Sequence, residues 1–98
     1  MDNLLAEPQP KYIELGGKQY QVSPANLNLY AGLEMDFNCG IDKLGDAIME
    51  RQATSLRKIL YRLLKKNNPE LTEDSIGEMV TADNMEDISR QIGEFLKV

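Results

Sequence analysis

Two adjacent glycines, Gly16 and Gly17, separate two short runs in which apolar and polar residues alternate. Adjacent glycines supply the positive φ angles that a two-residue turn between antiparallel strands requires. The pattern predicts a β-hairpin over residues 11–22, with Leu15 opposite Lys18. In this register one side of the hairpin carries Ile13, Leu15, Tyr20 and Val22. The other side carries Tyr12, Glu14, Gln19 and Gln21. Because an isolated hairpin is marginally stable in water, its apolar side must be covered by a helix or a further strand.

The rest of the chain has the residue spacing of helices. Ser23 followed by Pro24 predicts the N-cap and the first turn of a helix. Gly40 predicts a left-handed C-cap, so this helix should end near residues 38–40. Its apolar stripe consists of Leu27, Leu29, Tyr30, Leu33 and Phe37.

A longer helix is predicted over residues 42–66, where isoleucine and leucine recur at helical spacing. The polar residues 50–52 weaken this repeat and leave open a kink or a break at that point. Residues 67–69, which end in proline, stop the helix. Thr72 and Asn84 each predict the N-cap of a shorter C-terminal helix.

Together these elements predict an α+β fold that is mostly α, with an N-terminal two-stranded β-hairpin followed by about four helices. Ninety-eight residues suit one domain with one core. We expect residues 1–10, which contain two prolines, to form a flexible N-terminal arm. Residues 11–98 should then form a single domain of hairpin and helices.

The chain contains no histidine and a single cysteine, Cys39. One cysteine cannot form an internal disulfide or, without histidine, a zinc site, so we expect Cys39 to be a small buried hydrophobe. Histidine is also the commonest general base at neutral pH, and no pair of carboxylates lies on an apolar stretch that would separate their pKa values. The composition therefore predicts a protein that is not an enzyme and that binds no metal or cofactor.

No apolar run approaches the ~20 residues that a membrane-spanning helix needs. The N-terminal residues also lack the basic region and apolar stretch of a secretory signal. We therefore expect a cytoplasmic protein that does not enter a membrane.

Charge is unevenly distributed along the chain. Residues 51–66 contain six of the eleven basic residues and no acid, whereas eight acids follow from Glu70 onward. Two interpretations stay open: the basic face is solvated and partly neutralised by the C-terminal helices, or it docks on an acidic partner. For the second interpretation the candidate contacts are Arg51, Lys58, Arg62 and Lys65. The net charge of −5 opposes binding to nucleic acid.

The triplet Asp74-Ser75-Ile76, at a predicted helix start, resembles the modification site of acyl carrier proteins, in which the serine carries phosphopantetheine. Carrier proteins place a Glu-rich stretch with Phe-Gly after that serine, whereas the similar LEMDFNCGID lies before it here. The order favours Ser75 as a first-turn helix residue, and a modified serine stays a lesser alternative.

Several segments, in their order along the chain, carry a wider resemblance: YIELGGKQYQV, LYAGLEMDF ending at CGI, LRKILYRLLKKNNPELT, SIGEMV and ISRQIGEFL. Together they resemble the tail assembly chaperones of long-tailed, siphovirus-type bacteriophages and prophages. The resemblance covers roughly residues 11–96 and includes no catalytic signature.

This resemblance implies a protein that acts during tail morphogenesis, is absent from the mature virion, and self-associates while it binds the tape measure protein. The tail tube protein is a possible further partner. For self-association we expect contacts at the open edges of the hairpin, with Tyr12, Glu14, Gln19 and Gln21. The alternative is a small acidic cytoplasmic adaptor or regulatory protein that binds one folded partner.

Overall fold

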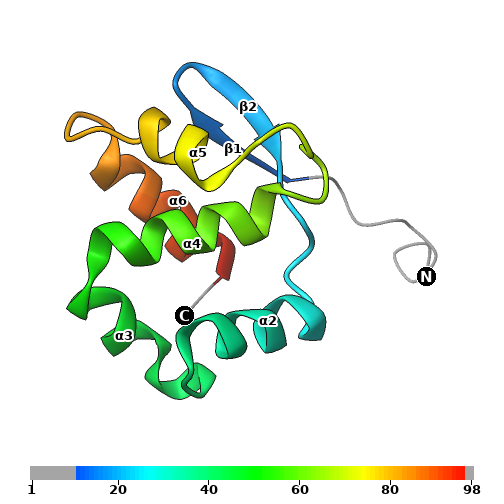
Figure 1. Ribbon diagram of the computed structural model, residues 1–98, viewed down its shortest axis with the longest axis vertical. Helices are drawn as coiled ribbons and strands as arrows, with labels where there is room; N and C mark the ends of the chain where they lie inside the picture. The colour runs from blue at the N-terminus through cyan, green and yellow to red at the C-terminus, as the bar shows by residue number, and fades with distance from the viewer. Residues whose placement is uncertain (1–10, 97–98) are drawn as a thin grey trace, which may run out of the picture.

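A computed structural model describes residues 11–96, so the predicted arm at residues 1–10 lies outside the described part of the chain. A two-stranded antiparallel sheet is followed by five α-helices, which confirms the predicted α+β, mostly α class (Figure 1). The elements are β1 (Tyr12–Leu15), β2 (Lys18–Gln21), α2 (Leu27–Phe37), a 3-10 turn η1 (Ile41–Lys43), α3 (Leu44–Glu50), α4 (Gln52–Leu64), α5 (Glu73–Met79) and α6 (Met85–Leu96).

The hairpin has the predicted register, with Leu15 opposite Lys18 and Tyr12 opposite Gln21. Gly16 and Gly17 have φ angles of 57° and 83°, which explains why both turn positions carry glycine. The predicted apolar side faces the helices: Ile13, Leu15 and Val22 are buried and Tyr20 is half-buried.

Both predicted caps of α2 are wrong. The N-cap is Asn26, whose side chain accepts a hydrogen bond from Leu29 N–H at 3.1 Å. Ser23 instead donates its backbone N–H to the Leu63 carbonyl at 2.9 Å, which ties this residue to α4 before the helix begins. At the other end the left-handed residue is Asn38, with φ 54°, because asparagine tolerates this conformation; Gly40 is extended.

The break that the sequence left open occurs at Arg51, whose φ of −140° and ψ of 72° separate α3 from α4. Thr72 caps α5 as predicted, because its hydroxyl accepts a hydrogen bond from Ser75 N–H. Asn84 precedes α6, but its side chain binds the preceding loop: it accepts from Thr81 N–H and donates to the Met79 carbonyl. Asn84 thus holds the predicted position directly before α6, where its carbonyl accepts from Ile88 N–H at 3.0 Å, but its side chain binds the loop.

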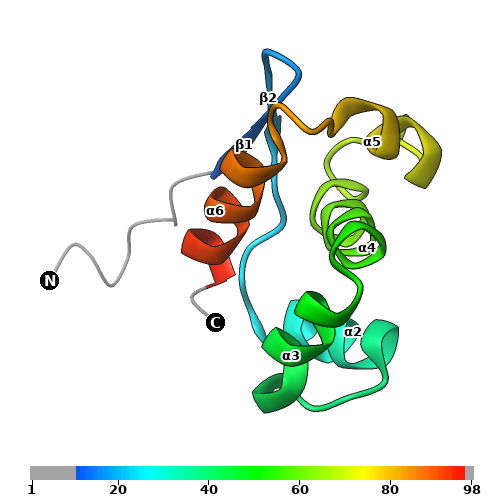
Figure 2. The same ribbon diagram turned by 90° about the vertical axis from the view of Figure 1, so that its left-hand side faces the viewer.

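Helix α4 crosses the middle of the molecule, with α5 and the hairpin on one side of it and α2 and α3 on the other (Figure 1). Figure 2 shows α6 across from α4, beneath the hairpin. Leucine and isoleucine side chains fill the space between them, among them Leu60, Leu63 and Leu64 of α4 and Ile88, Ile92 and Leu96 of α6. Burial of each such side chain contributes about 1.5–3 kcal/mol, so this shared core holds α6 against the rest of the fold.

Cys39 is only partly buried, so the prediction of a fully buried space-filling cysteine is wrong. It lies in the turn after α2, where Cys39 N–H donates to the Glu34 carbonyl at 3.3 Å. None of the helices within residues 11–96 is long and apolar enough to cross a membrane.

Candidate functional site

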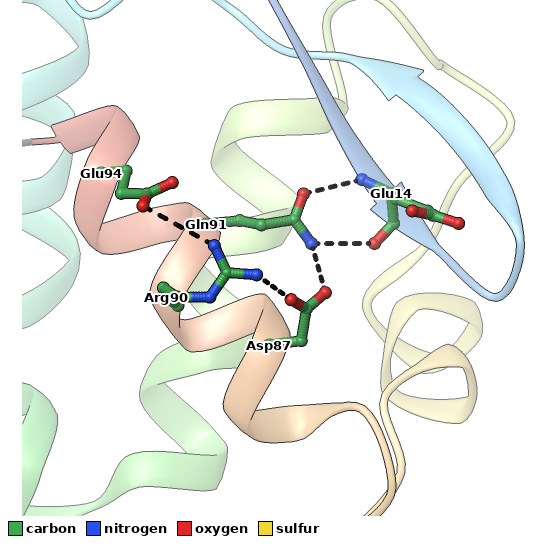
Figure 3. Close-up of polar contacts among 5 residues, drawn as sticks. All are labelled: Glu14, Asp87, Arg90, Gln91 and Glu94. Carbon is green, nitrogen blue, oxygen red and sulfur yellow. Dashed lines mark hydrogen bonds and ion pairs between the residues drawn. The ribbon is translucent and has the colours of Figure 1, made fainter.

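The outer edge of β1 is held by a glutamine from the last helix (Figure 3). Glu14 N–H donates to Gln91 Oε1 at 3.1 Å, and Gln91 Nε2 donates to the Glu14 carbonyl at 3.4 Å. The same amide donates to Asp87 at 3.0 Å, and Arg90 pairs with both Asp87 and Glu94. Gln91 therefore occupies the two backbone groups of Glu14 that an added strand would use.

The outer edge of β2 is less covered. Val22 N–H donates to the Lys11 carbonyl at 2.9 Å, which makes these two residues a hydrogen-bonded pair of the ladder. Since such pairs alternate in an antiparallel ladder, the backbone groups of Gln19 and Gln21 point away from β1. Asn68 Nδ2 donates to the Gln21 carbonyl at 3.0 Å. Within residues 11–96, both backbone groups of Gln19 are left without a hydrogen-bond partner.

The prediction of open hairpin edges is thus wrong for both backbone groups of Glu14 on β1 and for the backbone carbonyl of Gln21 on β2. The side chains predicted to meet another subunit do face solvent: Tyr12, Glu14, Gln19 and Gln21. From the sequence, Asn68 was predicted only as part of a helix stop, and no sequence signal indicated that Gln91 binds the hairpin edge. The structure leaves this hairpin an exposed polar side and, within residues 11–96, two very short free edges, at Tyr12 on β1 and around Gln19 on β2, which are poor templates for strand addition.

A groove of about 230 Å³ runs beside α4 and brings together three of the four predicted basic contacts. Its lining residues are Asp36, Lys58, Tyr61, Arg62, Lys65 and Glu73. Arg51 lies outside the groove, at the junction of α3 and α4. The predicted cluster is therefore smaller than the sequence indicated.

Arg62 is already bound within the molecule. Its guanidinium donates two hydrogen bonds to the Asp36 carboxylate, from Nε at 2.6 Å and from Nη2 at 3.0 Å. The hydrogen bond that Arg62 donates to Asp36 raises the pKa of Arg62, partial burial opposes the rise, and the charge of Asp36 adds to it. These two hydrogen bonds join α2 to α4, so the guanidinium of Arg62 is already engaged within the fold.

Lys58 and Lys65 are the free cations of this groove: no carboxylate of residues 11–96 lies within ion-pair distance of either. The Lys65 ammonium lies 5.2 Å from the centre of the Tyr61 ring, where a cation–π interaction holds it. Arg57 meets Glu73 of α5 at 3.8 Å, with both side chains nearly half exposed. Within residues 11–96, the predicted neutralisation of the basic face of α4 by the C-terminal helices is thus limited to the weak ion pair of Arg57 and Glu73.

A second pocket, of about 240 Å³, lies between α4, α5 and the start of α6, and most of the residues that line it are apolar. Its lining includes Leu56 and Arg57 of α4, Ile76 and Gly77 of α5, Val80 and Met85. Arg57 borders this pocket, and its ion-pair partner Glu73 borders the basic groove. One face of α4 and α5 therefore offers an apolar pocket next to free positive charge.

Helix α2 carries apolar residues on two faces. Leu29 and Leu33 are buried, but Leu27 and Met35 are 82% and 81% exposed. Ala31, also exposed, lies one turn from each of them, so the three form a stripe at spacing i, i+4 and i+8. We call this the α2 stripe. The prediction that Leu27 lies beside the apolar stripe of Leu29 and Leu33 is wrong, because Leu27 lies on the opposite side of the helix from these two residues.

Within residues 11–96, no group of three or more Cys, Asp or Glu side chains is placed to hold a metal ion. The Ser75 hydroxyl is engaged in the reciprocal cap with Thr72, donating to the Thr72 carbonyl at 2.9 Å and accepting from its N–H at 2.8 Å. No protein-family model, no curated protein and no solved structure was found to match this chain.

Proposed function

We propose that this protein is a tail assembly chaperone of a long-tailed bacteriophage or prophage. In this role it acts in the cytoplasm of the bacterial host, self-associates, and binds the tape measure protein during tail morphogenesis, with the tail tube protein as a further partner. It then leaves before the virion is mature. It needs no cofactor and catalyses no reaction.

The observation that carries the proposal is the presence of two exposed contact surfaces of different chemistry on one small chain. The α2 stripe is apolar and almost fully exposed at Leu27 and Met35. The face of α4 and α5 combines an apolar pocket with the free cations Lys58 and Lys65. Exposed apolar surface of this kind marks sites that bind other proteins.

A chaperone for a long helical protein must bind apolar helical faces in many copies and release them. Separate surfaces on one chain allow each copy to contact more than one neighbour, and many weak contacts add up through multivalency. The phage role itself comes from the resemblance of the sequence to tail assembly chaperones. An adaptor that binds one folded partner would need only one such surface.

Co-expression tests the proposal. A coiled-coil fragment of the tape measure protein from the same phage or prophage should be insoluble alone and soluble with this chain, and the two should co-purify. A fragment that stays insoluble, or that never binds the purified chain, would contradict the proposal. Binding of a single copy per fragment would favour the adaptor instead.

A further inference from the structure

Two consecutive segments of the chain carry opposite charge, the first acidic and the second basic. Residues 27–50, which form α2, η1 and α3, contain five acids and one lysine. Residues 51–69, which form α4 and the following turn, contain six basic residues and no acid. Figure 1 shows α2 and α3 below α4, so the two charge groups lie on neighbouring but different elements.

The basic side includes a site for an apolar side chain. The pocket between α4 and α5 has a floor of Leu56 and Ile76, both buried, and Gly77 leaves one wall without a side chain. A Cβ placed on Gly77 would lie 3.4 Å from Arg57 Cδ, an ordinary contact, so larger side chains at this position would extend into the pocket. Lys58 and Lys65 line the neighbouring groove, which meets the site at the Arg57–Glu73 ion pair.

The α2 stripe has the complementary chemistry. Its apolar side chains Leu27, Ala31 and Met35 project from a helix whose charged residues are both acidic. Of these acids, Asp36 binds Arg62, whereas Glu34 is exposed beside the stripe and engages only one carboxylate oxygen within residues 11–96, which accepts from Ile41 N–H at 3.1 Å. A helix with apolar residues on both faces is usually covered on both.

We infer that the α2 stripe of one copy docks on the face of α4 and α5 of the next copy, with an apolar side chain in the Gly77 pocket and Glu34 near Lys58 or Lys65. This contact is the interface through which the proposed chaperone self-associates. The inference therefore rests on the proposed function. Because the two surfaces differ, the contact is head-to-tail and builds a ring or an open filament instead of a closed two-fold dimer.

The hairpin edge is the competing location for the contact between copies. Gln91 covers Glu14, Asn68 covers the Gln21 carbonyl, and within residues 11–96 only Tyr12 on β1 and Gln19 on β2 keep both outward backbone groups free. Such a short ladder cannot contribute the stability of a paired strand. The α2 stripe and the Gly77 pocket instead provide apolar burial together with opposite charge.

The test uses two variants of the full chain, each lacking one surface. The stripe variant carries Leu27→Gln and Met35→Lys, at positions so exposed that the fold should be kept. The groove variant carries Gly77→Met and Lys58→Glu, which fill the pocket and reverse a free charge; Lys58→Glu alone serves if the double change impairs folding. Circular dichroism confirms that each variant is folded, and Gln19→Pro serves as the control that blocks the hairpin edge.

Sedimentation velocity then measures assembly of each protein alone and in mixture. Wild type and Gln19→Pro should form concentration-dependent oligomers, whereas each surface variant alone should associate at least ~10-fold more weakly. Mixed together, the stripe and groove variants should form a 1:1 dimer, because each retains the surface that the other lacks.

Four results would overturn the inference: a monomeric wild type, a surface variant that assembles like wild type, a mixture that stays monomeric, or loss of assembly in Gln19→Pro. If a monomeric wild type still solubilises the tape measure fragment, only the head-to-tail contact is wrong. If the expected dimer forms but the fragment is never bound, the contact is correct and the proposed phage role is wrong.

Discussion

Gln91 on α6 binds Glu14 on β1 as a neighbouring strand would, by accepting from its backbone N–H at 3.1 Å and donating to its carbonyl at 3.4 Å. Gln91→Ala removes both hydrogen bonds and should lower the free energy of unfolding by about 1 kcal/mol, because the site is partly exposed. Urea denaturation measures the change. Gln52→Ala, at an exposed position of α4, is the control and should change stability by less than about 0.5 kcal/mol. Equal effects of the two substitutions would show that the hairpin does not depend on this contact.

Gly32 and Arg62 should show a strong energetic coupling. A Cβ on Gly32 would lie 2.6 Å from Arg62 Cζ, so Gly32→Ala must displace the guanidinium from the position in which it binds Asp36. In an Arg62→Ala background the same change should stabilise the protein by about 1 kcal/mol, the helix propensity gained over glycine. In the parent this gain should be cancelled by loss of the ion pair. A double-mutant cycle in urea measures the coupling, and identical effects of Gly32→Ala in both backgrounds would refute it.

Ser75 should remain unmodified by a phosphopantetheinyl transferase, because its hydroxyl is bound to Thr72 in the first turn of α5. Intact mass after co-expression with such an enzyme is the measurement, and a gain equal to the prosthetic group would restore the carrier-protein alternative. Ser75→Ala should instead cost about 1 kcal/mol in stability through loss of the reciprocal cap.

Self-association should weaken with salt without being abolished. Raising the salt concentration from about 0.1 M to about 1 M shortens the Debye length from about 10 Å to about 3 Å and screens Glu34 from Lys58 and Lys65. Burial of the α2 stripe does not depend on this attraction, so part of the assembly should persist. Sedimentation velocity at both salt concentrations tests this, and assembly that strengthens with salt would assign the contact to apolar surface alone.

The hairpin was predictable because its signals are local. Gly16 and Gly17 set the turn, and strict alternation on either side set the register and the buried side. The cap of α5 was predictable for the same reason, since Thr72 reaches Ser75 only three residues away. The start of α2 was not, because the backbone N–H of Ser23 binds Leu63, forty residues later.

The candidate site was only partly predictable. Basic residues clustered in the sequence, but which of them stay free depends on long-range partners such as Asp36, which claims Arg62. The exposure of Leu27 and Met35 was also hidden, because apolar residues occur on both faces of α2 and periodicity alone does not say which face the core covers. Contacts distant in sequence therefore decided both the free cations and the free apolar surface.

The most direct test of the proposed chaperone role is the stoichiometry of its complex with a coiled-coil fragment of the tape measure protein. Sedimentation velocity across a titration gives the number of copies bound to each fragment, and fragments of increasing length give its dependence on length. The proposed role predicts several copies per fragment, with the number rising in proportion to fragment length. A complex that stays at one copy whatever the length, or the absence of any complex, would contradict it.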